Sequence, residues 1–451
     1  MEQKKPHLKK DIGLFIATAL VTGNIMGSGI FMLPATLAKK SGPGATMLAW
    51  VLTAVGSIFL ALSFAKLGSK IPKTGGPYEY SKSAFGDFTG FLSAWLYWNG
   101  SWIGNAAVII AIASYAGMLF PILGTSHIAG LLFTSAILWM FTIINIVGVR
   151  LAGKIQTTIT VFEILLFLFF IVAAGTHFHI SNVMPLFPKG KGIGTMPIAA
   201  TSTLWAFVGL ESASITAGEI KNPEKNVKRS TILGIIIATV MYMGINIAAM
   251  GAESNIELAQ SGAPIADILS KYFGSNVVTF VTIGAVVSIL GTTIGWILST
   301  ARVAYAAGND KIFPSVFSKV HPKYKTPYAS LIIGSVLVNI LLFMNYNKSF
   351  TSAFSFVALL ATLSFLPVYA MTAASEIMLI SKRGEKFNLF TFIKNSIVPL
   401  LGFIYAVWAI YGSGAEIVMY GFLLILAGIP FYIYMSLKNK DKINALRNKV
   451  I

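Results

Sequence analysis

The chain has 451 residues, of which 55% are hydrophobic and 11% charged, with a formal net charge of +18 and a mean hydropathy of +0.75. This composition excludes soluble domains, which carry roughly 25% charged residues, and disordered chains, which combine low hydrophobicity with high net charge. The absence of cysteine excludes disulfides, thiolate metal sites and thiol catalysis. The composition therefore predicts a polytopic membrane protein.

About twelve apolar runs along the chain are long enough to cross a bilayer, which needs roughly 20 residues. Because the runs are unbroken and do not alternate, they predict helices rather than the strands of a β-barrel. In chain order the expected spans are 13–37, 44–68, 88–118, 127–148, 155–176, 196–218, 230–251, 275–305, 327–345, 351–380, 396–412 and 415–437. The connecting loops are too short for a further domain, so we expect a single polytopic domain over residues 1–451.

The basic residues are concentrated on one side of this expected topology. If both termini lie on the same side, that side carries 28 of the 34 Lys and Arg residues, and the opposite side carries 6. The positive-inside rule then places both termini, residues 1–12 and 438–451, in the cytoplasm. The net charge is therefore a topology signal, and we expect the lipid bilayer but no nucleic acid as a partner.

Glycines interrupt two of the expected spans. Gly23, Gly27 and Gly29 lie within seven residues of the first span, and each weakens a helix by about 1 kcal/mol relative to alanine. The sixth span contains Gly209 and, two residues later, Glu211. Non-helical backbone at membrane depth is tolerated where it lines a cavity, so this pair of interruptions predicts a binding site. Close helix packing is the alternative explanation of the glycines.

The first and sixth spans are five apart, as an inverted repeat of five plus five helices requires. We expect the two repeats over about 13–176 and 196–380, followed by two further helices over about 396–437. The expected fold class is an all-α integral membrane protein of about 12 transmembrane helices, with broken helices 1 and 6.

The two interruptions suit a zwitterionic ligand. The N–H groups freed after Gly27 and Gly29 form the positive end of a half-helix, which attracts a carboxylate, and the carbonyls freed around residues 206–209 suit an ammonium group. Together they match an α-amino acid. Glu211 and Glu163 are the carboxylates that we expect within the membrane, where an ionisable group is a functional candidate; a hydrogen-bonded structural glutamate is the alternative at both positions.

At these residues the chain resembles the amino acid–polyamine–organocation superfamily, and within it the arginine–agmatine antiporter branch. The motifs that carry the resemblance extend over nearly the whole chain. They are Gly23-Asn24-Ile25-Met26-Gly27-Ser28-Gly29, Leu33-Pro34-Ala35, Tyr97-Trp98, Trp102-Ile103-Gly104-Asn105, Leu204-Trp205, Glu211-Ser212-Ala213-Ser214, Lys221-Asn222-Pro223, Gly295-Trp296 and Gly412-Ser413-Gly414-Ala415. The resemblance implies a LeuT-like inverted-repeat fold, commonly a homodimer, that exchanges amino acids and amines across the bacterial inner (cytoplasmic) membrane.

The resemblance also implies roles for residues around the interruptions. Ser28 and Gly29 would hold the substrate carboxylate, Trp205 would cap the site from the periplasmic side, and Asn105 would contact the substrate or helix six. Trp296 would stack on a cationic side chain as a middle gate, a contact worth roughly 2 kcal/mol when desolvated; bulky packing is the alternative for both tryptophans. Further substrate-binding residues implied in the same way are Ile25, Tyr97, Gly100, Ser101, Val208 and Ala361.

A second group of residues would form a gate that faces the cytoplasm. The resemblance implies that Tyr97, Glu211 and Tyr369 form this gate, with Glu211 as a candidate pH sensor.

The chain departs from that branch at several positions. Ala361 stands where the branch has a small hydroxylated residue, Val108 replaces a methionine, and Gly100-Ser101 replaces an alanine–cysteine pair. Glu163 lies where the branch is apolar and where some proton-coupled relatives carry a lysine, which makes it a candidate proton site. These departures leave the substrate and the coupling open.

We therefore expect an antiporter that exchanges a cationic amino acid, such as arginine, for its decarboxylated amine by alternating access. The alternative is a proton-coupled amino acid symporter in which Glu163 carries the proton. An intramembrane enzyme would need a catalytic pair or a histidine-rich zinc site, and the spans contain neither, so we expect no enzymatic activity, no cofactor and no metal.

Overall fold

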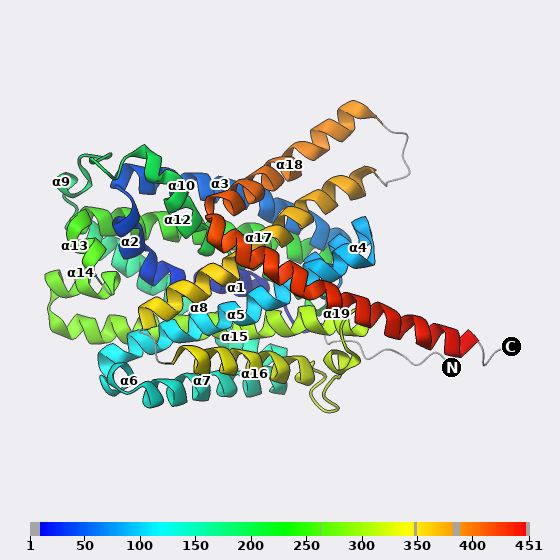
Figure 1. Ribbon diagram of the computed structural model, residues 1–451. Coiled ribbons are helices and arrows are strands. Elements are labelled where there is room, and N and C mark those ends of the chain that lie inside the picture. Colours follow the sequence, from blue (N-terminus) through cyan, green and yellow to red (C-terminus); the bar gives the residue numbers. More distant parts are fainter. Residues whose placement is uncertain (1–9, 262, 347–349, 382–387, 448–451) are drawn as a thin grey trace.

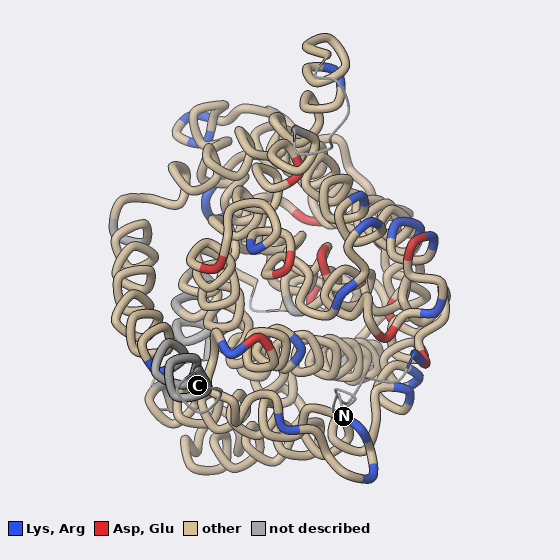
Figure 2. The backbone as a smooth tube through the Cα atoms, turned by 90° about the vertical axis from the view of Figure 1, so that its right-hand side faces the viewer, with Lys and Arg blue, Asp and Glu red and all other residues tan. Residues whose placement is uncertain are grey.

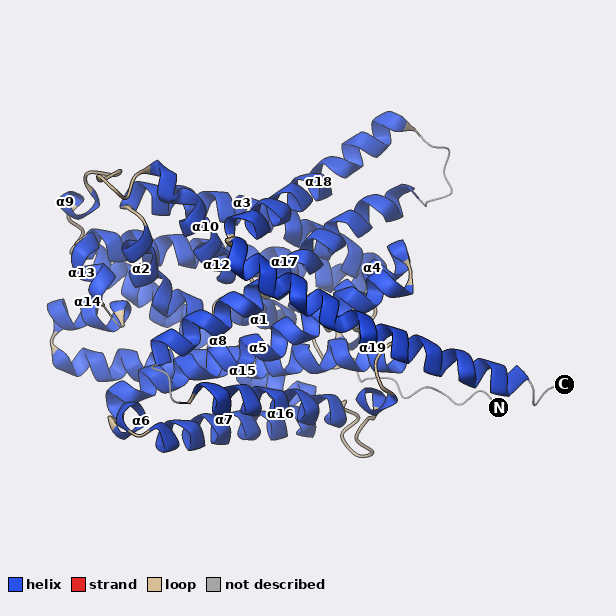
Figure 3. Ribbon diagram, viewed as in Figure 1, coloured by secondary structure: helices blue, strands red, loops and turns tan. Residues whose placement is uncertain are grey.

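The computed structural model describes residues 10–261, 263–346, 350–381 and 388–447. Within these ranges the chain is helical, and the only extended pairing is an isolated bridge between Ile12 and Ile220 (Figure 3). Ten helical segments are long and apolar enough to cross a membrane, and Tyr328–Met344 is a shorter apolar helix. With the broken segment at Met196–Ile215, these give about the twelve crossings that the sequence predicts, which confirms an all-α membrane protein.

Ten continuous helices build most of the bundle. They are α3 (Pro43–Lys70), α5 (Asp87–Leu119), α7 (His127–Val147), α8 (Val149–Gly175), α12 (Pro223–Ala252), α15 (Ser275–Asn309), α16 (Tyr328–Asn345), α17 (Phe350–Ser381), α18 (Leu389–Gly412) and α19 (Ala415–Arg447). Proline opens several helices in the first turn, as in α3 and α12, where its missing N–H costs no hydrogen bond. Charged and polar residues extend several helices past the expected apolar runs, so that α8 begins at Val149 and α19 ends at Arg447.

Short helices lie between the long ones. These are α4 (Pro77–Phe85), α6 (Ile122–Thr125), α9 (Ile180–Val183), α13 (Asn255–Gln260), α14 (Pro264–Phe273), and the 3-10 turns η1 (Ile193–Thr195), η2 (Ala217–Glu219) and η3 (Ser315–Ser318). We call the end of the bundle that carries α4 and the C-terminal end of α19 the terminal face, and the opposite end, with α9, α13 and α14, the distal face (Figure 1). Figure 2 looks onto the terminal face, over which Lys and Arg are spread among fewer Asp and Glu residues.

The helices divide into a buried centre and an apolar periphery. Helix α5 packs against α15 and α17, and most of its side chains from Gly90 to Ala116 are buried. By contrast, α18 and α19 expose large apolar side chains such as Ile404, Phe422 and Leu426, as expected where helices face lipid. The centre of the bundle is therefore where polar groups and backbone breaks can be shielded from lipid.

Two crossings are broken at this centre. The first consists of α1 (Leu14–Ile25) and α2 (Ser28–Lys40), and the second of α10 (Met196–Trp205) and α11 (Ser212–Ile215). The breaks lie side by side, because a Cβ built on Gly209 would lie 2.8 Å from the backbone of Asn24. Both interruptions therefore occur where the glycines predict them. The inverted repeat over about 13–176 and 196–380 stays a prediction.

Candidate functional site

The first break exposes the beginning of α2 to the centre of the bundle. Helix α1 ends at Ile25, Gly27 is the N-cap of α2, and no side chain of the described residues caps that N-terminus. A Cβ on Gly27 would lie 2.7 Å from Thr292, so this close approach requires glycine. The N–H of Ile30 already donates to the carbonyl of Gly27 over 3.3 Å, and the N–H groups of residues 28 and 29 before it are available to bind an anionic group such as a carboxylate. The backbone of Ser28 lies there, but its side chain is outside the part of the chain that the structure describes.

The carbonyl groups that end α1 are bound by side chains from other helices. Thr292 in α15 donates to the carbonyl of Gly23 over 2.8 Å, and Tyr242 in α12 donates to that of Ile25 over 2.7 Å. Between them, the indole N–H of Trp296 donates to the carbonyl of Asn24 over 3.1 Å. These bonds provide donors for the carbonyl groups at the end of α1, and the bond from Trp296 fixes the orientation of its ring. Sequence reasoning missed Thr292 and Tyr242; the one signal for Thr292 is its position one helical turn before Trp296.

The second break is a non-helical loop over residues 206–211. Gly209 has a φ of +116°, a conformation that favours glycine, and it lies against Asn24 of the first break. The amide of Asn24 donates to the hydroxyl of Ser212 over 2.8 Å and accepts a bond from Gln156 in α8 over 2.9 Å. Asn24 therefore links both breaks to α8.

Glu211 lies at the end of this loop with its carboxylate fully buried. It accepts hydrogen bonds from the hydroxyls of Tyr97 in α5, over 2.7 Å, and Tyr369 in α17, over 2.6 Å. The N–H of Gly209 donates to the same carboxylate over 3.2 Å. The structure thus brings the three predicted gate residues together, and three donors from three parts of the chain surround one carboxylate.

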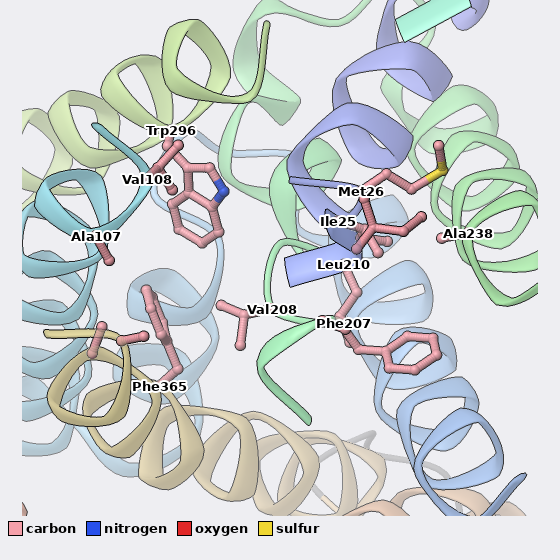
Figure 4. Close-up of a cluster of buried hydrophobic side chains, with 14 of the residues drawn as sticks. Ile25, Met26, Ala107, Val108, Phe207, Val208, Leu210, Ala238, Trp296 and Phe365 are labelled. Atoms are coloured by element: carbon pink, nitrogen blue, oxygen red, sulfur yellow. The ribbon is translucent and has the colours of Figure 1, made fainter. Parts of the chain in front are cut away.

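A small cavity of about 20 Å³ lies between the two breaks (Figure 4). Five of the predicted substrate-binding residues line it, namely Ile25, Gly29, Trp205, Val208 and Trp296, together with Asn24, Gly27, Val108, Ala206 and Thr292. No Asp, Glu, Lys or Arg lines it. Sites that enclose small molecules have volumes of roughly 300–1,000 Å³, so the structure is a closed conformation in which only a water-sized space remains.

The other predicted pocket residues whose side chains the structure describes are not among those that line this cavity. The hydroxyl of Ser101 donates to the carbonyl of Tyr97 over 2.7 Å, and a Cβ on Gly100 would meet Ser364 and the carbonyl of Ala361. The amide of Asn105 donates to Thr300 over 3.0 Å, and its side-chain oxygen has no partner among the described residues. Asn105 is therefore a buried polar group with an unused acceptor, close to the cavity.

Aromatic rings connect the cavity with Glu211. The ring of Trp296 lies 5.4 Å from that of Phe365, and Phe365 lies 5.1 Å from the ring of Tyr97, whose hydroxyl binds Glu211. Figure 4 shows Phe365 on the side of Val208 away from Ile25. Sequence reasoning missed Phe365, because an apolar residue in an apolar span carries no distinguishing signal.

Glu163 in α8 lies apart from the cavity and is 1% exposed. Its Oε1 atom has no hydrogen-bond partner among the described residues. Three residues earlier on the same helix, the hydroxyl of Thr160 donates to the carbonyl of Ala19 over 3.4 Å, so α8 packs directly on α1 before its break.

Two ion pairs, one of them fully buried, join helices between the cavity and the terminal face. Arg302, six residues after Trp296 in α15, binds Glu219 through two nitrogens at 2.7 and 3.2 Å, and both side chains are almost fully buried. Lys66 in α3 pairs with Glu376 in α17 over 2.5 Å. The sequence analysis did not single out Arg302, although it lies within the expected span 275–305.

No group of three or more His, Asp or Glu side chains is arranged to hold a metal ion within the described ranges. The features that the site does offer are N–H groups at the start of α2, two tryptophans and an uncharged lining.

The chain is similar over nearly its whole length to one protein family and to several named antiporters. The model of the family described as amino acid permease matches residues 12–442. A Bacillus subtilis (strain 168) protein, provisionally named an arginine/ornithine antiporter, is 33% identical over 98% of this chain and 100% of its own length. An arginine/ornithine antiporter of Pseudomonas aeruginosa is 29% identical over 91% of this chain and 88% of its own. An arginine/agmatine antiporter of Chlamydia pneumoniae is 28% identical over 96% of this chain and 91% of its own.

Proposed function

This chain belongs to the amino acid permease family, and from that premise we propose that it exchanges an arginine-like cationic amino acid for a second cation by alternating access. The protein is a transporter and not an enzyme. We propose the decarboxylated amine as the second cation, and ornithine, which is part of the names of two relatives, is the alternative.

The observation that carries this proposal is the uncharged cavity between the two breaks, with tryptophan on its walls. A substrate carboxylate fits the free N–H groups at the start of α2. A guanidinium group fits the face of Trp296, because a desolvated cation on an indole ring gains about 2 kcal/mol without a carboxylate partner. Substrates that lack a positive side chain gain neither this contact nor a substitute for it.

Alternating access follows from the size of the cavity. A space of about 20 Å³ cannot hold arginine, so the helices around the breaks must move to admit a substrate from either side. Glu211 with its two tyrosines and the pair Arg302–Glu219 lie between the cavity and the terminal face, and we propose that they separate when that face opens.

Orientation and assembly are part of the proposal. The excess of Lys and Arg on the side of the termini favours a cytoplasmic terminal face in a bacterial inner membrane. The apolar side chains exposed on α18 and α19 face lipid or a second copy in a homodimer.

The test is uptake of labelled arginine into proteoliposomes loaded with agmatine, ornithine, lysine or nothing. We expect uptake only when an internal cation is present, fastest with agmatine. Trp296→Leu should abolish exchange in a protein that still folds, whereas Trp408→Leu, in the peripheral helix α18, should leave it unchanged. Arginine uptake into empty vesicles, or normal exchange by Trp296→Leu, would contradict the proposal.

A second candidate function is proton-coupled symport, favoured by one observation, the buried Oε1 atom of Glu163 that lacks a partner. A carboxyl group in this position can exchange a proton without breaking a hydrogen bond. Uptake into empty vesicles driven by an inward proton gradient, and lost in Glu163→Gln, would identify this function in place of antiport.

A further inference from the structure

A second and much larger cavity opens at the terminal face. Its volume is about 590 Å³, and it lies between the N-terminal segment, the junction of α7 with α8, and the loop that precedes α16. The charged residues on its walls are Asp11, Arg150, Lys154, Glu219, Lys323 and Lys325. None of its lining residues lines the small cavity between the breaks, so it is a separate space.

The walls of this cavity carry an excess of positive charge that is not neutralised by carboxylates, although the Lys323 ammonium lies 5.4 Å from the centre of the Tyr324 ring. Arg150, Lys154, Lys323 and Lys325 form no ion pair with any residue in the described ranges. Glu219 does not offset them, because its carboxylate is held by Arg302 at 2.7 Å. Four cationic side chains therefore line this cavity, and besides Glu219 its lining contains one carboxylate, that of Asp11.

The backbone adds N–H donors, whose partial positive charge has the same sign as the side chains. Gly148 is the N-cap of α8, a helix of 27 residues, and no side chain in the described part of the molecule caps this end. Residues 149–151, whose N–H groups have no partner within the helix, line the cavity. The helix dipole thus adds to the potential of the cationic side chains, and the combination favours an anion with several acceptor oxygens.

Apolar side chains on the same walls indicate whether the anion is a free solute or part of a lipid. Val147 and Leu151 line the cavity and are 39% and 44% exposed on the outside of the bundle. The cavity is therefore continuous with a surface that suits hydrocarbon, at the end of two membrane-spanning helices. A solute anion needs no such surface, whereas a lipid places its charged headgroup and its acyl chains in this arrangement.

We propose that the cavity binds a phosphate group, namely that of an anionic phospholipid whose acyl chains lie along Val147 and Leu151. Basic pockets between helices at the cytoplasmic side of a membrane suit such headgroups. The ligand would join the N-terminal segment, α8 and the loop before α16. Its site adjoins the bridge in which Ile12 accepts from Lys221 over 2.8 Å and donates to Glu219 over 3.0 Å, so binding would stabilise the arrangement that closes the terminal face.

The experiment follows thermal unfolding of the purified full-length protein in an uncharged detergent. Phosphatidylglycerol, phosphatidylcholine and inorganic phosphate are titrated separately. We expect phosphatidylglycerol to raise the unfolding midpoint in a saturable manner and the other two to leave it unchanged, because a ligand that binds only the folded state stabilises it. A rise with inorganic phosphate alone would keep the phosphate site but assign it to a free solute rather than to a lipid.

Charge-matched variants separate the site from general attraction to anionic lipid. Lys154→Gln with Lys323→Gln removes two charges from opposite walls, and Lys225→Gln with Lys228→Gln removes two exposed charges from α12, outside the cavity. The first pair should raise the half-saturating concentration of phosphatidylglycerol about 30-fold, at roughly fivefold per lysine, and the second less than twofold. Both should unfold at the wild-type midpoint without lipid. Equal effects of the two pairs, or no effect of either, would overturn the proposal, and the readout is independent of what the protein transports.

Discussion

Two glutamates are buried at the centre of this membrane protein, and their surroundings are opposite. Glu211 accepts three hydrogen bonds, from Tyr97, Tyr369 and the N–H of Gly209. Glu163 is just as buried, but its Oε1 atom has no partner among the described residues. The helix break explains one of these donors, because it frees the N–H of Gly209, whereas the continuous helix α8 uses its own N–H groups internally. The other two donors are hydroxyls on the neighbouring helices α5 and α17.

Burial alone therefore does not define the role of a carboxyl group in the membrane; its hydrogen-bond partners do. A carboxyl group with three donors holds α5, α17 and the second break together. An unpaired buried charge costs many kcal/mol, and no side chain of the described residues offsets that cost at the Oε1 atom of Glu163. The first glutamate is therefore a structural link that depends on its acceptor oxygens, and at the second the Oε1 atom makes no hydrogen bond with the described residues that a substitution would break.

The largest expected effect comes from removing the acceptor at the first glutamate. Glu211→Ala removes the acceptor of two buried hydroxyls, each at a cost of about 1–3 kcal/mol, and leaves the N–H of Gly209 with only its longer bond to the Tyr369 hydroxyl at 3.4 Å. We expect the free energy of unfolding in detergent to fall by about 3 kcal/mol or more, with loss of exchange. A loss below about 1 kcal/mol would show that water or a rearrangement replaces the carboxylate.

Glu211→Gln retains the shape of the side chain but not its charge. We expect the protein to fold and to bind arginine, because an amide oxygen still accepts from one tyrosine and the second hydroxyl can turn to accept from the amide. The rate of exchange should lose its dependence on pH between acidic and neutral conditions, measured in proteoliposomes with equal pH on both sides. An unchanged pH profile would exclude Glu211 as the pH sensor.

Removing one of the donors should have an intermediate effect. Tyr369→Phe deletes a hydroxyl that lies 2.6 Å from Glu211, and a hydrogen bond to a charged group is worth about 1.5–3 kcal/mol. Chemical denaturation in detergent measures this loss. Tyr411→Phe is the control, because Tyr411 is 85% exposed on α18 and should change stability by less than about 0.5 kcal/mol. Equal stability of the two variants would remove the tyrosine from the link.

The smallest expected effect on stability is at the second glutamate. Glu163→Gln keeps the shape of the side chain and breaks no hydrogen bond at Oε1 with the described residues, so the free energy of unfolding should change by less than about 1 kcal/mol, and Glu163→Leu should be equal or more stable. Transport measured in parallel tests whether Glu163 takes part in transport. Unchanged exchange in both variants identifies Glu163 as a structural residue. A large loss of stability in Glu163→Gln would mean that the carboxyl group is ionised and paired after all.

Much of the fold could be predicted from the sequence because it depends on local properties. The crossings follow from apolar runs, and the breaks follow from Gly27 and Gly209, which the structure uses for close backbone approach and, at Gly209, for a positive φ. The family resemblance implied that Tyr97, Glu211 and Tyr369 act together as a gate. Their meeting could not be derived from periodicity, since Glu211 lies 114 positions from the first tyrosine and 158 from the second.

Other residues of the site could not be predicted at all. Tyr242 and Thr292 cap carbonyls of α1 from two other helices, and Phe365 continues the aromatic path from Trp296, yet each looks ordinary within its own span. The buried pair of Arg302 and Glu219 is similar, because the sequence places them 83 positions apart at the ends of two crossings. Such partners are selected by packing, which no local window contains.

The sequence by itself therefore determined that the chain is a bundle of about twelve membrane helices, that two of them break, and that most positive charge lies with the termini. Only the tertiary structure decided which carboxylate is bound by three donors and which by none, and how little space remains between the breaks. Hydrophobicity and glycine act through the nearest neighbours along the chain. Hydrogen-bond partners and cavities depend on the relative positions of helices, to within a fraction of an ångström.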